Sequence, residues 1–73
     1  MTNSYENLAN AVILKAAEDY RKSLRTLSQY PYDHNACSER KSIEQFFRSD
    51  YFVILSNLDP EALIERLNKE VAV

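Results

Sequence analysis

The chain contains no glycine among its 73 residues. Ordinary domains contain roughly 7% glycine, so about five would be expected. Glycine builds the loops that cradle phosphate groups and the tight turns of two-residue β-hairpins. The sequence therefore excludes glycine-loop nucleotide sites and disfavours hairpin-rich β folds. An apolar content of 45% also argues against a disordered chain.

The size and cysteine content allow a single domain and no internal crosslink. Cys37 is the only cysteine, and one Cys with one His makes a metal cage implausible. We expect neither a metal nor a cofactor. The polar N-terminus and the shortness of the apolar runs predict no signal peptide and no membrane span. These features favour a reduced, cytoplasmic setting.

The first third of the chain predicts one long helix over residues 3–29, capped by Asn3 or Ser4 and ending before Pro31. Its apolar residues recur at steps of three and four and fall within an arc of about 120°, the width of a core-facing stripe. A helix of this length would measure about 40 Å. The stripe consists of Tyr5, Ala9, Val12, Ile13, Ala16, Tyr20, Leu24 and Leu27.

A connector over residues 30–35 is predicted after this helix, followed by a second helix over residues 36–48. Asp33 and Asn35 are alternative N-caps for that second helix, because their side chains accept hydrogen bonds from free backbone N–H groups.

Two further helix starts follow. Ser49 predicts a short third helix over residues 50–57, and Asp59 with Pro60 predicts a last helix over residues 60–70. The sequence thus predicts an all-α bundle with one long N-terminal helix, two further main helices and a short fourth. We expect the long helix to pack against Ile43, Phe46 or Phe47, Ile54, Leu63 and Leu67.

Catalytic chemistry has one weak candidate, formed by Asp33, His34 and Cys37 near a predicted helix start, where a thiol pKa is lowered. Residues so close in sequence seldom supply the geometry of a catalytic triad, and the domain is small for both a core and a substrate pocket. We interpret the three as a polar connector with a small buried cysteine, and we predict no catalytic residue and no enzyme.

Basic residues make nucleic-acid binding an alternative function, because phosphate contacts need clustered Lys and Arg. The candidates are Arg21, Lys22 and Arg25, extended by Arg40, Lys41 and Arg48. The net charge of −2 and the two phenylalanines on the second helix disfavour this function.

Protein binding is favoured by apolar and aromatic residues that do not fit one core-facing side. Adjacent helical residues such as Tyr51 and Phe52 point in directions about 100° apart, so they cannot all be buried together. Tyr, Phe and Arg are enriched at interface centres, although these residues could equally complete the core. The predicted contact residues are Leu14, Arg21, Arg25, Tyr30, Tyr32, Arg48 and Tyr51.

Three segments carry a resemblance to a protein family. The segments AAEDYRKSLRTL at residues 16–27, IEQFFRSDYF at 43–52 and LDPEALIERL at 58–67 resemble blocks in small phage and prophage proteins of Gram-positive bacteria. The chain departs from that pattern at Pro60, where the relatives often have glycine. The resemblance implies a phage genomic setting and no particular activity.

We therefore expect a non-enzymatic phage accessory protein that binds another protein in the host cytosol, as an inhibitor of a host or defence (CRISPR-type) protein. A nucleic-acid-binding phage regulator and a structural homodimer, in which the long helix pairs with its mate, are the alternatives. Corners without glycine predict a stiff scaffold, which suits a fixed contact surface better than closure over a substrate.

Overall fold

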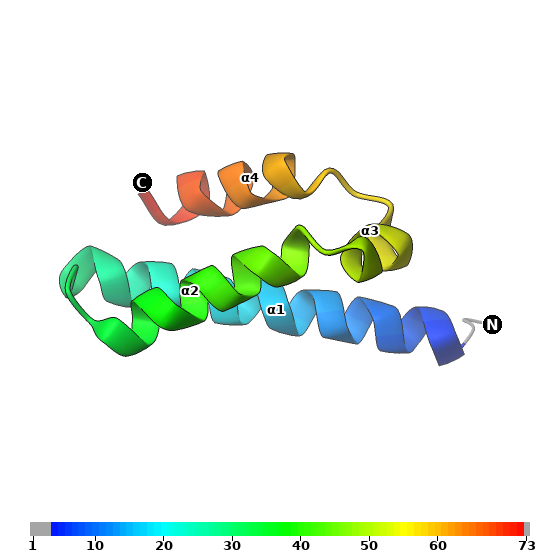
Figure 1. Ribbon diagram of the computed structural model, residues 1–73, viewed down its shortest axis with the longest axis horizontal. Coiled ribbons are helices and arrows are strands. Elements are labelled where there is room, and N and C mark those ends of the chain that lie inside the picture. The colour runs from blue at the N-terminus through cyan, green and yellow to red at the C-terminus, as the bar shows by residue number, and fades with distance from the viewer. Residues whose placement is uncertain (1–3, 73) are drawn as a thin grey trace.

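The computed structural model describes the backbone of residues 4–72 and the side chains of residues 10–71. Within that range it is all helical, which confirms the predicted fold class. Helices α1 and α2 lie antiparallel, α4 runs beside them, and α3 forms a short corner at the end where α1 begins (Figure 1). The longest dimension is 43 Å, set by α1. The helices are α1 (Ser4–Gln29), α2 (His34–Phe47), α3 (Asp50–Ser56) and α4 (Pro60–Ala72).

Side-chain caps start the later helices. The Asp33 carboxylate accepts the Ala36 N–H at 2.9 Å, so Asp33 is the N-cap and α2 starts two residues earlier than predicted. The Ser49 hydroxyl accepts the Phe52 N–H at 3.2 Å at the start of α3. Asp59 accepts the Glu61 N–H at 3.0 Å ahead of α4. These bonds satisfy donors that the first helical turn leaves free.

Asn57 ends α3 in the left-handed conformation, with φ of 55°. Its backbone N–H donates to the Val53 carbonyl at 2.9 Å. Glycine usually occupies such a position because a Cβ atom is unfavourable there, and asparagine is the common substitute. The glycine-free chain thus turns between α3 and α4 on asparagine.

The core joins residues from all four helices around an aromatic centre. The Phe47 and Phe52 rings lie 5.1 Å apart, and Tyr20 meets Phe47 edge-on at 5.7 Å. Tyr20, Phe47 and Phe52 are fully buried. Such ring pairs stabilise a small core beyond their buried area. The buried cluster is Ala17, Tyr20, Leu24, Phe47, Phe52, Ile64 and Leu67.

Several core predictions are confirmed and others are wrong. Tyr20, Leu24 and Leu67 are buried as expected. Ile54, expected in the core, is 81% exposed, and Phe52 occupies the interior instead. The two lie about 200° apart on a helix, so a helix of two turns cannot bury both. Val12 is also 41% exposed, because α2, α3 and α4 cover only part of the stripe.

Some predictions lie outside the described residues. They are the helix start and cap at Asn3 and the burial of Tyr5 and Ala9.

Candidate interaction surface

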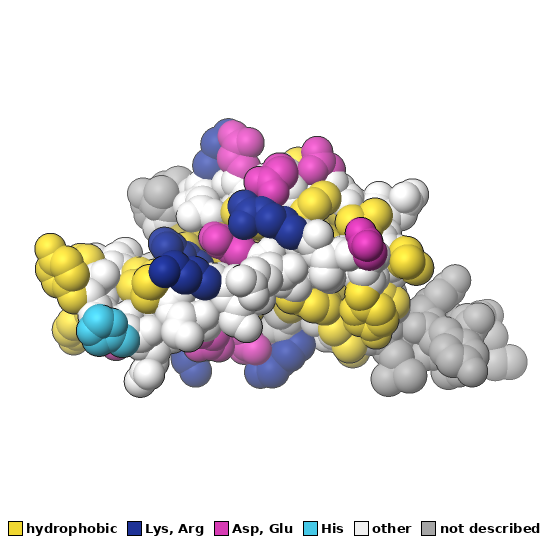
Figure 2. Space-filling model, in the orientation of Figure 1, with side chains coloured by type: hydrophobic (Ala, Val, Ile, Leu, Met, Phe, Trp, Pro, Cys, Tyr) yellow, Lys and Arg dark blue, Asp and Glu magenta, His cyan; other side chains and the backbone are white. Residues whose placement is uncertain are grey.

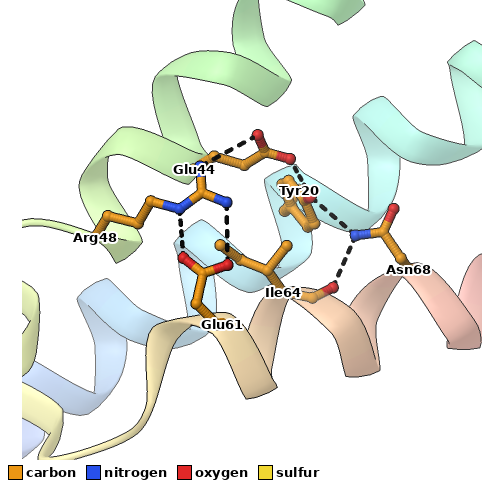
Figure 3. Close-up of polar contacts among 6 residues, drawn as sticks. All are labelled: Tyr20, Glu44, Arg48, Glu61, Ile64 and Asn68. Carbon is orange, nitrogen blue, oxygen red and sulfur yellow. Dashed lines mark hydrogen bonds and ion pairs between the residues drawn. The ribbon is translucent and has the colours of Figure 1, made fainter.

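A polar network joins α1, α2 and α4 beside the aromatic centre (Figure 3). The Tyr20 hydroxyl donates to Glu44 at 2.6 Å and accepts from the Asn68 amide at 3.0 Å. Asn68 also donates to the Ile64 carbonyl at 2.7 Å. Burial, aided by the hydrogen bond to Glu44, raises the pKa of Tyr20 to about 12. The network holds the helices in register and keeps Tyr20 neutral.

Arg48, a predicted contact residue, is engaged within the molecule. Its guanidinium donates to both carboxylate oxygens of Glu61, at 2.6 and 3.2 Å, and lies 3.8 Å from Glu44 (Figure 3). The hydrogen bonds to Glu61 raise the pKa of Arg48, and the same bonds lower the pKa of Glu61. Arg48 therefore ties the end of α2 to the start of α4.

Arg21, a second basic candidate, is also engaged within the molecule. Arg21 donates to Glu70 of α4 at 2.8 Å. Arg25 is exposed one turn further along α1. Because Arg21 and Arg48 each contact a carboxylate, they offer less positive charge to phosphate groups than the sequence suggests.

The residues around Cys37 do not assemble into a triad-like arrangement. The Asp33 carboxylate caps α2, His34 is exposed and Cys37 is half-buried. Over the part of the chain that the structure describes, no three His, Cys, Asp or Glu residues are grouped to hold a metal ion.

The outward side of α3 exposes several large apolar side chains. Tyr51 is 60% exposed, Ile54 81% and Leu58 48%. Tyr51 and Ile54 are three residues apart and so share one side of the helix, and Leu58 follows the helix end. Hydrophobic side chains gather at this end of the molecule (Figure 2). We call Tyr51, Ile54 and Leu58 the α3 outer face.

Acidic residues flank the α3 outer face in the sequence. Residues 50–65 include the acidic side chains Asp50, Asp59, Glu61 and Glu65 and contain no Lys or Arg. All four are exposed; Glu61 forms an ion pair with Arg48 and Glu65 with Lys69. The surface thus combines exposed apolar groups with a negative border.

A second apolar surface lies between α1 and α2. It is an open groove of about 470 Å³, which we call the α1–α2 groove. Its apolar lining is Ala11, Val12, Ala16, Ile43 and Phe46, and Lys15, Asp19 and Ser42 complete it. The ring of Phe46 lies 6.4 Å from that of Tyr51, so the groove approaches the α3 outer face.

The remaining predicted contact residues are scattered. Tyr30 and Tyr32 are 64% and 92% exposed in the connector between α1 and α2, at the end of the molecule opposite α3. Leu14 is 62% exposed on α1 but does not line the groove. Tyr51 was predicted as a contact residue and lies on the α3 outer face. Ile54, Leu58 and Val12 are also exposed but were not predicted as contact residues. Because Ile54 lies three residues after Tyr51, helical spacing could have indicated that Ile54 shares the exposed side of Tyr51.

Comparison of the chain with protein-family models, with curated proteins and with solved structures finds no match. The resemblance to phage proteins therefore stays a prediction. Among the described residues, no helix combines the length and apolar character needed to cross a membrane.

Proposed function

We propose that the protein acts by binding another protein, and that the α3 outer face is its contact surface. The observation that carries this proposal is the exposure of Tyr51, Ile54 and Leu58 together around one short helix. Single exposed apolar residues are normal, whereas adjacent ones rimmed by polar groups mark interaction sites. Tyrosine is also enriched among the residues that dominate binding energy.

The acidic border supports a proposal about the partner's chemistry. It favours a partner whose apolar site is flanked by Lys or Arg, because complementary charges speed association and fix register. Proteins that handle nucleic acid carry such basic surfaces to contact phosphates. This supports the more specific proposal of a phage accessory protein that inhibits a host or defence (CRISPR-type) protein in the host cytosol.

Nucleic-acid binding remains the second proposal, with less support. Two of its main residues, Arg21 and Arg48, contact Glu70 and Glu61. An electrophoretic mobility shift at low salt that is lost in Arg25→Glu would favour this function over protein binding.

The test of the α3 outer face starts from proteins retained by the chain from a host lysate. Each is then purified, and its affinity for the wild type and variants is measured by calorimetry. Ile54→Asp is expected to lower the affinity for a true partner by about 10- to 100-fold, because a charge replaces a central apolar contact. Tyr32→Asp, at the opposite end, is the matched control and should bind like the wild type.

Circular dichroism must first show that both variants are folded. If Ile54→Asp binds as tightly as the wild type, or if the folded chain retains no protein that binds again in purified form, the proposal is wrong.

A further inference from the structure

The α1–α2 groove lies on the side of the α1–α2 pair that faces away from α4. On α1, Asp19 lines the groove whereas Arg21 contacts Glu70 of α4. Residues two apart on a helix point about 200° apart. On α2, Ser42 lines the groove while Glu44 bonds Tyr20 on the α4 side. One side of the pair is therefore covered by a helix and the other is open.

We propose that a second copy of this chain occupies the groove, so that the α1–α2 pairs of two copies pack face to face as four helices about a two-fold axis. Such an interface uses the same surface on both copies and must be self-complementary. Ala11 and Ala16 are small enough to let another helix approach closely, and Val12 and Ile43 supply apolar contact.

The groove carries one basic and one acidic side chain, Lys15 and Asp19, and this pair supports a second copy of the chain as the occupant. Lys15 and Asp19 lie four residues apart on α1 and form an ion pair of 3.2 Å within the helix. Their side chains are 72% and 33% exposed. Suppose that two α1 helices pack antiparallel and that the two-fold axis crosses them midway between Lys15 and Asp19. Each Lys15 then faces the Asp19 of the other copy. The groove is thus electrostatically complementary to itself.

One chain also exposes more surface than a compact monomer of its mass. The accessible surface is 5636 Å², whereas a compact monomer of this mass exposes about 4,700 Å². The excess is about 900 Å², and a standard interface buries about 800 Å² on each partner. The radius of gyration, 13.1 Å, likewise exceeds the roughly 11 Å of a compact chain this long.

Sedimentation equilibrium over a range of protein concentrations tests this proposal. The wild type is expected at twice the chain mass of 8.5 kDa. Val12→Lys introduces charge at a half-exposed groove position and is expected to weaken the dimer at least tenfold. Leu14→Lys, the same change on the same helix outside the groove, should leave the dimer intact. A wild type that stays monomeric at all concentrations, or a dimer that survives Val12→Lys, overturns the proposal.

A charge exchange tests the antiparallel contact. Lys15→Glu places two acidic groups together across the interface and should weaken association about tenfold. Combining it with Asp19→Lys restores opposite charges and should recover the dimer. If the double variant associates no better than Lys15→Glu, the proposed register is wrong. Because this test measures self-association, its result is distinct from that of Ile54→Asp on a foreign partner.

Discussion

Tyr20 on α1 donates its hydroxyl hydrogen to Glu44 on α2 across 2.6 Å, although the two residues are 24 positions apart. The same hydroxyl accepts a hydrogen bond from Asn68 on α4. Tyr20 is completely buried, so its hydroxyl depends on these two side chains. One polar atom thus connects the three longest helices.

Tyr20→Phe is expected to lower the free energy of unfolding by about 1–2 kcal/mol, because it removes both hydrogen bonds while keeping the ring. Urea denaturation followed by circular dichroism measures this change. Tyr51→Phe is the matched control, and since Tyr51 is 60% exposed its effect should stay within about 0.5 kcal/mol. Equal stability of the two variants would contradict the role assigned to Tyr20.

Alkaline pH should destabilise the protein through the same residue. The pKa of Tyr20 is raised from 10.0 to about 12 in the fold. Because Tyr20 ionises less readily in the fold than in the unfolded chain, its neutral hydroxyl contributes to the free energy of unfolding below pH 10. This contribution is lost as the pH rises from 10 toward 12. Urea denaturation at several pH values should therefore show a steeper alkaline loss in the wild type than in Tyr20→Phe. Parallel curves for the two proteins would count against this prediction.

Asn57→Ala should lower the free energy of unfolding by about 1 kcal/mol, because alanine tolerates a φ of 55° poorly. Asn57→Gly should be as stable as the wild type or slightly more so, since glycine adopts this conformation freely. Thermal unfolding of the three proteins compares them directly. The left-handed turn would be energetically unimportant if alanine and glycine gave the same midpoint.

Truncating Phe52 should lower the free energy of unfolding far more than truncating Ile54, although both residues belong to the apolar run of α3. Phe52→Ala is expected to cost about 3–5 kcal/mol because it leaves a cavity in the core. Ile54→Ala should change stability by less than about 0.5 kcal/mol, because this side chain is 81% exposed. Chemical denaturation measures both values, and a large loss of stability in Ile54→Ala would contradict the outward position of this side chain.

The starts of the last three helices could be predicted from sequence to within two residues, because their causes are local. Asp33, Ser49 and Asp59 each accept a backbone N–H within three residues, and Pro60 fits only the first turn of a helix. Choosing between Asp33 and Asn35 was harder, since both residue types cap helices equally well.

The packing of α3 could not be predicted in the same way. Its five consecutive apolar residues have no helical periodicity, so the run does not indicate whether Phe52 or Ile54 points inward. The bonds of Tyr20 to Glu44 and Asn68 join distant segments, which local spacing does not pair.

The predicted stripe of α1 was wider than the buried face of the helix. Val12 lies on its edge and lines the α1–α2 groove instead of the core. The part of the stripe that does not reach the core therefore lines the α1–α2 groove.

The position of Asn68 near the end of the chain has a consequence for how the protein folds. The Tyr20 hydroxyl gains its last partner only when residue 68 is in place, and Ile64 and Leu67 join the buried cluster from the same helix. A protease that cut the exposed corner at residues 57–59 would separate these residues from α1 and α2. Because neither fragment would hold the complete buried cluster, we expect the described helices to unfold together as one cooperative unit.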